Sequence, residues 1–433
     1  MSYSQLVNNS EIDNKLIGNP QVTFFKSVFR RHTSFYKGLY SDVQKHFVYD
    51  AEPGTQKSPE GGISHGAFDL ITNIFIEHKI SNIASDKYIR PNIGNTIIKD
   101  IIFKVGNNDL FTVEGLYMEA RSELDNPYIP SHNGSSIPPL MSNNGSDSGS
   151  LTLSCYTGSQ YNINTMAGGV IGSNIKDGIG APSQPYHTDT FYTYPNFYFC
   201  KEYGSSFPIC ALNNEITLLE INYRNFNEFT NSKELTTLSS TVHIEYVNLS
   251  DDERLRFINN TDPYMYYNIS KVNLEGVDMC VPSTNLPIRQ IFFVGQGINQ
   301  DDSNGSQSLS TPTSLSTHGN CSGIDITINS DPLYTKTDDN LSIFTKHNIK
   351  HFKGYGRDLS IEDGKSSGYL DSIGVHSFCL DNTNTPSGHL SSSANTRINF
   401  KPLGSTDRKI EIYLEVINFY KISGGKLGIM FSS

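Results

Sequence analysis

The sequence contains no tryptophan, no excess of basic residues and no long apolar segment. Its longest strictly apolar runs, such as Ile291 to Val294, fall far short of the ~20 residues that a membrane-spanning helix needs. The first residues, MSYSQLVNNSEIDNKLIGNP, also lack the apolar core of a secretory signal. We therefore expect a soluble protein that is made in the cytosol.

Positive charge is outweighed by negative charge. The 433 residues include 33 Lys and Arg against 44 Asp and Glu, which gives a net charge of −11. Because nucleic-acid-binding chains normally carry a basic surface, we expect no direct contact with nucleic acid. The six cysteines include no CxxC pair, which argues against a zinc ribbon and favours scattered buried thiols in a reducing compartment.

Motifs that carry catalysis are equally scarce. Gln300 stands where a dinucleotide-binding loop would need its third glycine, and Asp147 replaces the serine of a nucleophile elbow. His347 and His351 have the spacing of two metal ligands on a helix, but Asn348 replaces the glutamate of a zinc protease. We predict no catalytic residue, no metal site, no cofactor and no enzymatic activity. A glycosidase stays open at this point, because one sequence cannot show which carboxylates pair.

Among the patterns that the sequence does contain, alternation of apolar and polar residues is the most frequent. In RKIEIYLEVINFY, residues 408–420, the apolar Ile410, Ile412 and Leu414 fall on one face, and Lys409 and Glu411 fall on the other. The same period of two recurs at 97–106, 215–226, 241–249 and 323–329. Many short strands separated by turn residues predict an all-β fold of sandwiches or barrels.

One helix is expected just past the middle of the chain, within residues 250–260. Ser250 and Glu253 have the spacing of a capping box, in which each side chain bonds a backbone N–H at the helix start. Leu255 and Ile258 give the helix a narrow apolar stripe. Its position suits a connector between two domains of roughly 200 residues each.

Two segments rich in Gly, Ser, Asn and Pro, at about 126–187 and 299–320, predict long surface loops. One such loop in each half suggests two related domains. Three Asn-x-Ser/Thr sequons in these segments, at Asn133, Asn144 and Asn304, would be the exposed candidates for glycan attachment.

A short segment near the N-terminus points to a family. In residues 18–33, GNPQ, TFFK and RRHT follow one another, separated by Val22 and by SVF. This resembles the N-terminal signature of the major capsid proteins of nucleocytoplasmic large DNA viruses. Further similar segments lie in order along the chain, at 97–120, 197–224, 251–257, 377–400 and the C-terminus.

The resemblance implies two consecutive eight-stranded jelly rolls with a short connecting helix. We assign an N-terminal arm to 1–22, a first jelly roll to 23–248, the connecting helix to 249–262 and a second jelly roll to 263–433. It further implies a structural protein of the virion capsid, assembled in the host cytoplasm. Three copies would form a pseudo-hexagonal capsomer that tiles an icosahedral shell. Its partners would be neighbouring capsomers, minor capsid and penton proteins, and an internal membrane.

The signature segment itself is expected to anchor the base of the first jelly roll. Its apolar residues recur at spacings of three and four, as in a helical turn, and buried arginines must be paired with carbonyls or carboxylates. A solvated strand edge is the alternative. The predicted base anchor comprises Phe24, Phe25, Val28, Phe29, Arg30, Arg31 and His32.

Two other functions remain open from the sequence. A minor double-jelly-roll component, or a scaffold that templates membrane curvature, would show a similar match. A carbohydrate-binding β-sandwich protein also fits the composition, but it would usually line its groove with tryptophan, which this chain lacks.

Overall fold

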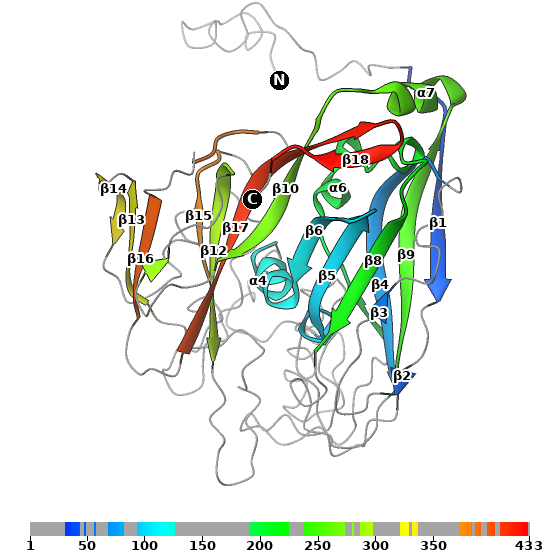
Figure 1. Ribbon diagram of the computed structural model, residues 1–433. Helices are drawn as coiled ribbons and strands as arrows, with labels where there is room; N and C mark the ends of the chain where they lie inside the picture. Colours follow the sequence, from blue (N-terminus) through cyan, green and yellow to red (C-terminus); the bar gives the residue numbers. More distant parts are fainter. Residues whose placement is uncertain are drawn as a thin grey trace, which may run out of the picture. The chain divides into compact units, whose positions relative to one another are not determined.

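The computed structural model describes about half of the chain: residues 31–43, 47–48, 56–57, 68–81, 93–125, 190–224, 237–272, 279–280, 286–297, 321–328, 331–336, 373–380, 382, 386–390, 396–402 and 408–431. The chain divides into two compact units, Met1–Phe35 and Tyr36–Ser433. The second unit contains nearly all of the described structure (Figure 1).

The first half of the second unit is built on two sheets. One has the strand order β1-β9-β4-β7, with β2 also paired to β9, and the other has the order β3-β8-β5-β6. The strands are β1 (Phe35–Val43), β2 (Phe47–Val48), β3 (Gln56–Lys57), β4 (Leu70–Ser81), β5 (Ile98–Val105), β6 (Asn108–Glu114), β7 (Thr190–Thr193), β8 (Thr217–Tyr223) and β9 (Thr237–Leu249).

The second half again forms two sheets. Their orders are β10-β17-β12-β15, with β18 also paired to β17, and β11-β16-β13-β14. The strands are β10 (Tyr264–Val272), β11 (Met279–Cys280), β12 (Ile288–Gly297), β13 (Cys321–Ile328), β14 (Asp331–Lys336), β15 (Ile373–Ser377), β16 (Thr396–Pro402), β17 (Arg408–Ser423) and β18 (Lys426–Ile429).

The two halves share one topology. If β2 and β18 are left aside, the first strand of each half pairs with the last, the last with the third, and the third with the sixth. In the other sheet of each half, the second strand pairs with the seventh, the seventh with the fourth, and the fourth with the fifth. The all-β prediction and the relation between the two halves are therefore confirmed at the level of strand order.

Alternation in the sequence explains why these strands form where they do. In β8 the buried positions are Thr217, Leu219, Ile221 and Tyr223, and the residues between them are partly exposed. Each strand predicted from this period, at 97–106, 215–226, 241–249, 323–329 and 408–420, coincides with a strand of the structure.

Helices are few among the described residues. They are α3 (Ile93–Thr96), α4 (Gly115–Asp125), α6 (Tyr198–Lys201) and α7 (Asp251–Asn259), with the 3-10 turns η3 (Tyr203–Ser205) and η4 (Ile209–Ala211). The predicted helix near 250–260 is confirmed as α7, but its predicted capping box is wrong, because the Ser250 side chain makes no cap hydrogen bond. The prediction also missed α4, which follows β6 directly and buries Leu116 and Met118.

Phenylalanines fill the core of the first half, where tryptophan is absent. The ring of Phe103 lies 5.1 Å from that of Phe207, in an edge-on contact, and 5.4 Å from that of Phe199. Phe111 and Phe197 complete the group, with ring centroids 5.7 Å apart. All five rings are nearly inaccessible to solvent, so they account for much of the apolar area buried in this half.

A buried polar cluster also lies inside the first half, on β4. His78 is fully buried; its Nδ1 lies 3.0 Å from Ser240 Oγ, and its Nε2 lies 3.0 Å from Thr193 Oγ1. The Tyr223 hydroxyl lies 2.8 Å from the same Ser240 Oγ. Burial disfavours the charged imidazolium and lowers the pKa of His78 to about 3.

Acid should therefore weaken this half of the molecule. An unfolded chain binds a proton at this histidine below pH ~6.5, whereas the buried His78 stays neutral down to about pH 3. The contribution of the neutral His78 to the free energy of unfolding is complete above pH ~6.5. It is lost as the pH falls, by about 2 kcal/mol between pH ~6.5 and pH ~5. His78→Gln should remove this part of the pH dependence of urea unfolding.

The matched control for this prediction is His389→Gln, because His389 is exposed. It should keep the pH dependence of the unchanged protein. An unfolding free energy that falls with pH as steeply in His78→Gln as in the unchanged chain would contradict a buried neutral His78.

Candidate functional site

The interface between the two halves is the most elaborate polar site among the described residues. The edge strand β6 of the first half lies beside the edge strand β10 of the second (Figure 1). The backbone N–H of Thr112 donates to Asn268 Oδ1 at 3.3 Å. Nearby, Asn108 Nδ2 donates to the carbonyl of Leu427 at 3.2 Å. The two jelly rolls are therefore joined by specific hydrogen bonds as well as by packing.

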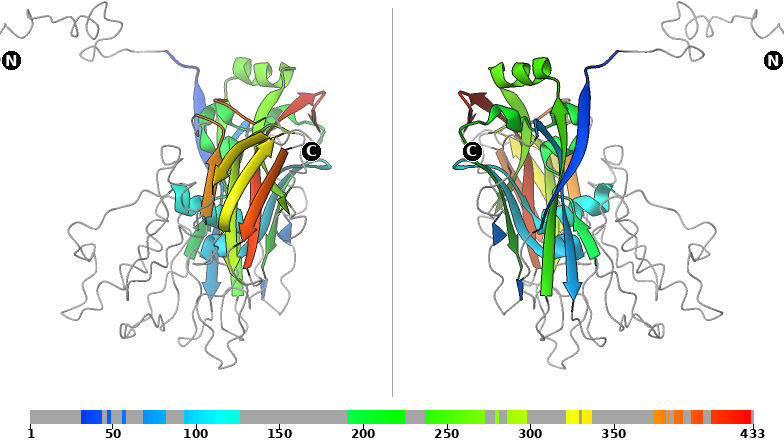
Figure 2. Two further views of the ribbon diagram at one scale, coloured as in Figure 1. Left: turned by 90° about the vertical axis from the view of Figure 1, so that its left-hand side faces the viewer. Right: turned by 90° about the vertical axis from the view of Figure 1, so that its right-hand side faces the viewer.

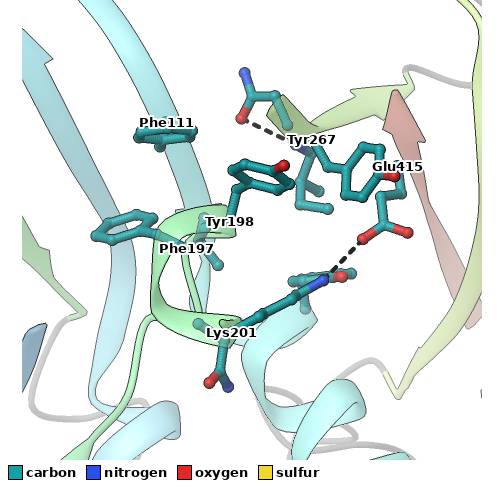
Figure 3. Close-up of a pocket in the computed structure, with 11 residues that line it drawn as sticks. Phe111, Phe197, Tyr198, Lys201, Tyr267 and Glu415 are labelled. Carbon is teal, nitrogen blue, oxygen red and sulfur yellow. Dashed lines mark hydrogen bonds and ion pairs between the residues drawn. The ribbon is translucent and has the colours of Figure 1, made fainter. Parts of the chain in front are cut away.

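A buried carboxylate lies at the centre of this interface. Glu415 of β17 accepts hydrogen bonds from Arg289 Nη1 of β12 at 2.9 Å and from Lys201 Nζ of α6 at 3.3 Å. Figure 3 draws the second of these contacts, between Lys201 and Glu415. The side chains of Glu415 and Arg289 are 2% and 1% exposed. Burial would raise the pKa of Glu415, but the positive charges of Lys201, Arg289 and Arg121 lower it to about 2. Glu415 is therefore ionised, and it binds a cation from each half.

Aromatic rings surround this charged group. The Arg289 guanidinium lies 4.4 Å from the ring centroid of Tyr267, in a cation–π contact. Tyr198 of the first half meets Tyr267 edge-on at 5.2 Å. Tyr117 of α4 contacts Phe292 at 5.1 Å and Tyr413 at 5.6 Å, which joins the first half to β12 and β17. These rings surround the charges with apolar surface, which strengthens the charge interactions between the halves.

A second ion-pair group lies further along the interface. Lys271 of β10 binds Glu114 of β6 at 2.9 Å and Glu411 of β17 at 2.8 Å. The Tyr413 hydroxyl donates to the same Glu114 carboxylate at 2.9 Å. Burial would lower the pKa of Lys271, but Glu411 and Glu114 together raise it above its usual range. This group also connects residues from both halves.

The space left at the interface is small. A cavity of about 20 Å³ lies there, which is room for roughly one water molecule. Its lining includes Phe111, Phe197, Tyr198, Lys201, Tyr267 and Glu415 (Figure 3). A cavity of this size cannot admit an organic substrate. We therefore interpret the residues around it as the packing contact between two domains.

The interface corrects one prediction about β17. Alternation in residues 408–420 puts Glu411, and Glu415 four residues on, opposite the apolar face, where a strand with one buried face would expose them. They are 5% and 1% exposed. The first jelly roll covers this face, so β17 is buried on both sides. Sequence reasoning also missed Lys201, Arg289 and Lys271, since a local pattern carries no sign of partners more than 100 residues away.

The connecting helix α7 is fixed by a further ion pair. Arg254 donates through Nε and Nη2 to the two carboxylate oxygens of Asp69, at 2.7 and 2.9 Å. The same carboxylate accepts the backbone N–H of Leu249 at 2.7 Å. The predicted apolar stripe of α7 does not face a core, because Leu255 and Ile258 are 53% and 37% exposed. Charge pairing with the first half therefore positions this helix.

The predicted base anchor is described only at its end. Arg31 and His32 are exposed, and His32 Nδ1 lies 2.8 Å from the carbonyl oxygen of Thr33. The other predicted anchor and glycan residues lie outside the described residues: Phe24, Phe25, Val28, Phe29, Arg30, Asn133, Asn144 and Asn304. His347 and His351 also lie outside them, as do the two predicted long loops.

Three further observations bear on the sequence predictions. Within the part of the chain that the structure describes, no three His, Cys, Asp or Glu residues are grouped to hold a metal. No described helix is long and apolar enough to cross a membrane. The described cysteine side chains, Cys200, Cys210 and Cys379, are free thiols, and burial raises the pKa of Cys210 to about 12.

Removing the charge of Glu415 should destabilise the whole chain. Glu415→Gln removes the carboxylate charge that Lys201 and the buried Arg289 share, so we expect a loss of about 3–5 kcal/mol in the free energy of unfolding, measured with urea. The control is Asp109→Asn, because Asp109 is 55% exposed and pairs with Lys104 at 3.4 Å. That change should cost less than about 1 kcal/mol. Equal small losses in both variants would contradict a structural role for the buried pair.

Comparison with known proteins places this geometry in context. No family model matches the chain. It is 22% identical to the major capsid protein of Pyramimonas orientalis virus over 303 residues, which cover 69% of this chain and 67% of the relative. It is 22% identical to the major capsid protein of Phaeocystis pouchetii virus over 314 residues, covering 67% of this chain and 58% of the relative.

Similarity in structure extends further than similarity in sequence. A chain of the PBCV-1 virus capsid superposes with a TM-score of 0.62 at 16% identity, over 95% of this chain and 100% of that chain. At this identity the match shows a shared fold, and the strand order described above agrees with it. The chain is therefore a double jelly-roll protein that is similar in sequence to the major capsid proteins of nucleocytoplasmic large DNA viruses, as its N-terminal signature predicts.

Proposed function

We propose that this chain is a structural capsid protein of a large double-stranded DNA virus. The observation that carries the proposal is the pair of topologically identical halves, joined by a buried interface of ion pairs and aromatic rings. Such an interface fixes two jelly rolls in one rigid building block. The similarity to viral major capsid proteins supports the same role.

Assembly would follow from this duplicated structure. Three chains close about a threefold axis, and their six jelly rolls form a pseudo-hexagonal capsomer that tiles an icosahedral shell. Closure requires a heterologous interface, in which one surface of a chain binds a different surface of the next. A permanent interface of this kind buries more than about 2,000 Å². The free energy of association between chains serves to fix the geometry of the capsomer. We therefore propose no catalytic step.

The proposed partners are neighbouring capsomers, minor capsid and penton proteins, and an internal membrane beneath the shell. The net charge of −11 argues against direct contact with the genome. Assembly in the host cytoplasm fits the free thiols at Cys200, Cys210 and Cys379, because disulfides are rare in that compartment.

The native mass of the purified protein tests the proposed oligomer. Light scattering at micromolar concentration should give about three times the chain mass of 48.2 kDa, and this mass should persist on dilution. A stable monomer would contradict the trimeric capsomer. The function would then shift to a minor capsid or scaffold component, or to a sugar-binding sandwich, which a glycan screen would distinguish.

We also propose that the segment from Phe24 to His32 anchors the base of the first jelly roll. Arg31 is exposed in the single chain, so its proposed carbonyl or carboxylate partners belong to the assembled capsomer. Arg30→Gln together with Arg31→Gln should lower the yield of trimer, because those acceptors lose a charged donor. Lys421→Gln with Lys426→Gln is the matched control, since both lysines are exposed on the C-terminal hairpin. An unchanged trimer yield and melting temperature in the arginine variant would rule the anchor out.

A further inference from the structure

Three polar side chains from three neighbouring strands form a hydrogen-bonded row on one sheet of the first half. Ser41 Oγ of β1 lies 2.8 Å from His243 Nδ1 of β9, and His243 Nε2 lies 3.0 Å from Glu77 Oε2 of β4. The residues on either side of His243, Val242 and Ile244, are buried, so the row lies on the face away from the core. This sheet faces the viewer in the right-hand view of Figure 2.

The chemistry of the three groups fixes the direction of both hydrogen bonds. An ionised carboxylate can only accept, so His243 Nε2 carries the hydrogen that is shared with Glu77. In a neutral imidazole the other nitrogen then has a free lone pair. Ser41 therefore donates its hydroxyl hydrogen to His243 Nδ1, and this nitrogen is placed to take the proton.

A hydroxyl, an imidazole and a carboxylate in this order are the arrangement that activates a serine nucleophile. The imidazole removes the proton as the oxygen attacks, and the carboxylate holds the imidazole in the required tautomer. Both distances in the row lie within the roughly 2.6–3.2 Å that proton transfer to a general base requires. Such a triad is recognised by its geometry and not by the order of its residues in the sequence.

An external substrate can reach this row. Ser41 is exposed, and the side chains of His243 and Glu77 are 13% and 34% exposed. His78 also lies 3.0 Å from a serine, Ser240, but it is fully buried and out of reach of a substrate. Exposure therefore distinguishes the Ser41 row from the buried polar cluster on β4.

Aromatic rings continue from His243 along the same sheet. Phe75 of β4 stacks on the His243 ring with centroids 4.7 Å apart, and Tyr194, the residue after β7, stacks on Phe75 at 5.5 Å. All three rings are only partly buried. They place an apolar surface beside the hydroxyl, which favours a substrate with an apolar acyl group.

The backbone of β1 can supply a donor for the negative charge that develops on an attacked carbonyl oxygen. Among the described strands, β1 pairs with β9 alone. Since successive residues of an antiparallel strand point their N–H groups to opposite edges, either Ser41 or both Tyr40 and Asp42 point theirs to the unpaired edge. A backbone N–H held in this way is the usual donor to an oxyanion.

We propose that Ser41 is a nucleophile for acyl transfer from esters of apolar carboxylic acids, with His243 as its general base and Glu77 as a positioning residue. Ser41 Oγ forms a bond to the ester carbonyl carbon while His243 Nδ1 takes the hydroxyl proton. The ester C–O bond then breaks, and the proton passes to the departing alkoxide, which leaves as an alcohol. A water molecule attacks the acyl group on Ser41, loses its proton through His243, and releases the carboxylic acid and free serine.

This activity is separate from the proposed capsid role and does not depend on the trimer. Local motifs could not reveal it, because His243 lies 202 positions from Ser41 and 166 positions from Glu77. Only the pairing of β1 and β4 with the two sides of β9 brings the three residues together.

A biotin-tagged fluorophosphonate tests the nucleophile directly. Its phosphorus bonds to the oxygen of an activated serine as fluoride leaves, and the histidine takes the serine proton. The full chain is incubated with the probe at neutral pH, digested and analysed by mass spectrometry. We expect the tag on Ser41 in the folded chain and not in the chain unfolded with urea. Ser41→Ala should lose this tag, and Ser34→Ala is the matched control that should keep it, since Ser34 is also exposed.

Two amide variants test the roles of the other residues. His243→Gln can still hydrogen-bond to Ser41 and Glu77 but cannot take the proton, so the rate of labelling should fall by more than about 100-fold. The exposed His389→Gln should keep the rate. Glu77→Gln should lower kcat for p-nitrophenyl butyrate by about tenfold or more and leave KM unchanged, because Glu77 acts through His243. Urea unfolding of each variant verifies that it is folded.

The result that would overturn the proposal is a folded chain whose Ser41 carries no tag. Equal labelling of folded and unfolded chains would also overturn it, as would a labelling rate that His243→Gln leaves unchanged. Ser41 would then react without its neighbours, and the row would serve only to hold the edge strand β1 to its sheet. None of these results changes the native mass, so the proposed trimer is tested independently.

Discussion

The buried carboxylate of Glu415, bound by Arg289 of its own half and Lys201 of the other, is the interaction on which the arrangement of the two halves depends. An ionised group in this position needs its partners at fixed places, because a charge left unpaired in the interior is strongly destabilising. The edge-on contact of Tyr198 with Tyr267 packs the two halves against each other in the same region. The relative orientation of the two jelly rolls is thus set by charge and shape together.

A fixed orientation is what a shell requires. The proposed trimer can close only if every chain presents its two jelly rolls at the same angle, so flexibility between them would work against assembly. Lys271, which binds Glu114 and Glu411, adds a second connection along the interface and resists rotation about the first. The pairing of Arg254 with Asp69 holds the connecting helix to the same body. These polar contacts favour one packing of the two halves over others.

Sequence patterns predicted the strands and the family, but not the site. Strands such as β8 and β9 follow from alternation, which is a local property. The helix α7 forms where it was predicted, although neither its capping box nor a buried apolar stripe is present. The second buried face of β17 could not be predicted, because it is created by a domain that lies far away in the sequence. Lys201 and Glu415 are 214 positions apart, and nothing near either residue signals the other. The N-terminal signature gave the family, although most of that segment lies outside the described residues.

The central claim is that two equivalent jelly rolls per chain generate a closed, pseudo-hexagonal particle. Electron microscopy of the purified protein tests it most directly, because class averages viewed down the symmetry axis reveal the number of lobes. The account predicts a closed ring of six lobes with threefold symmetry. Particles of two lobes only, or open chains of them, would contradict it.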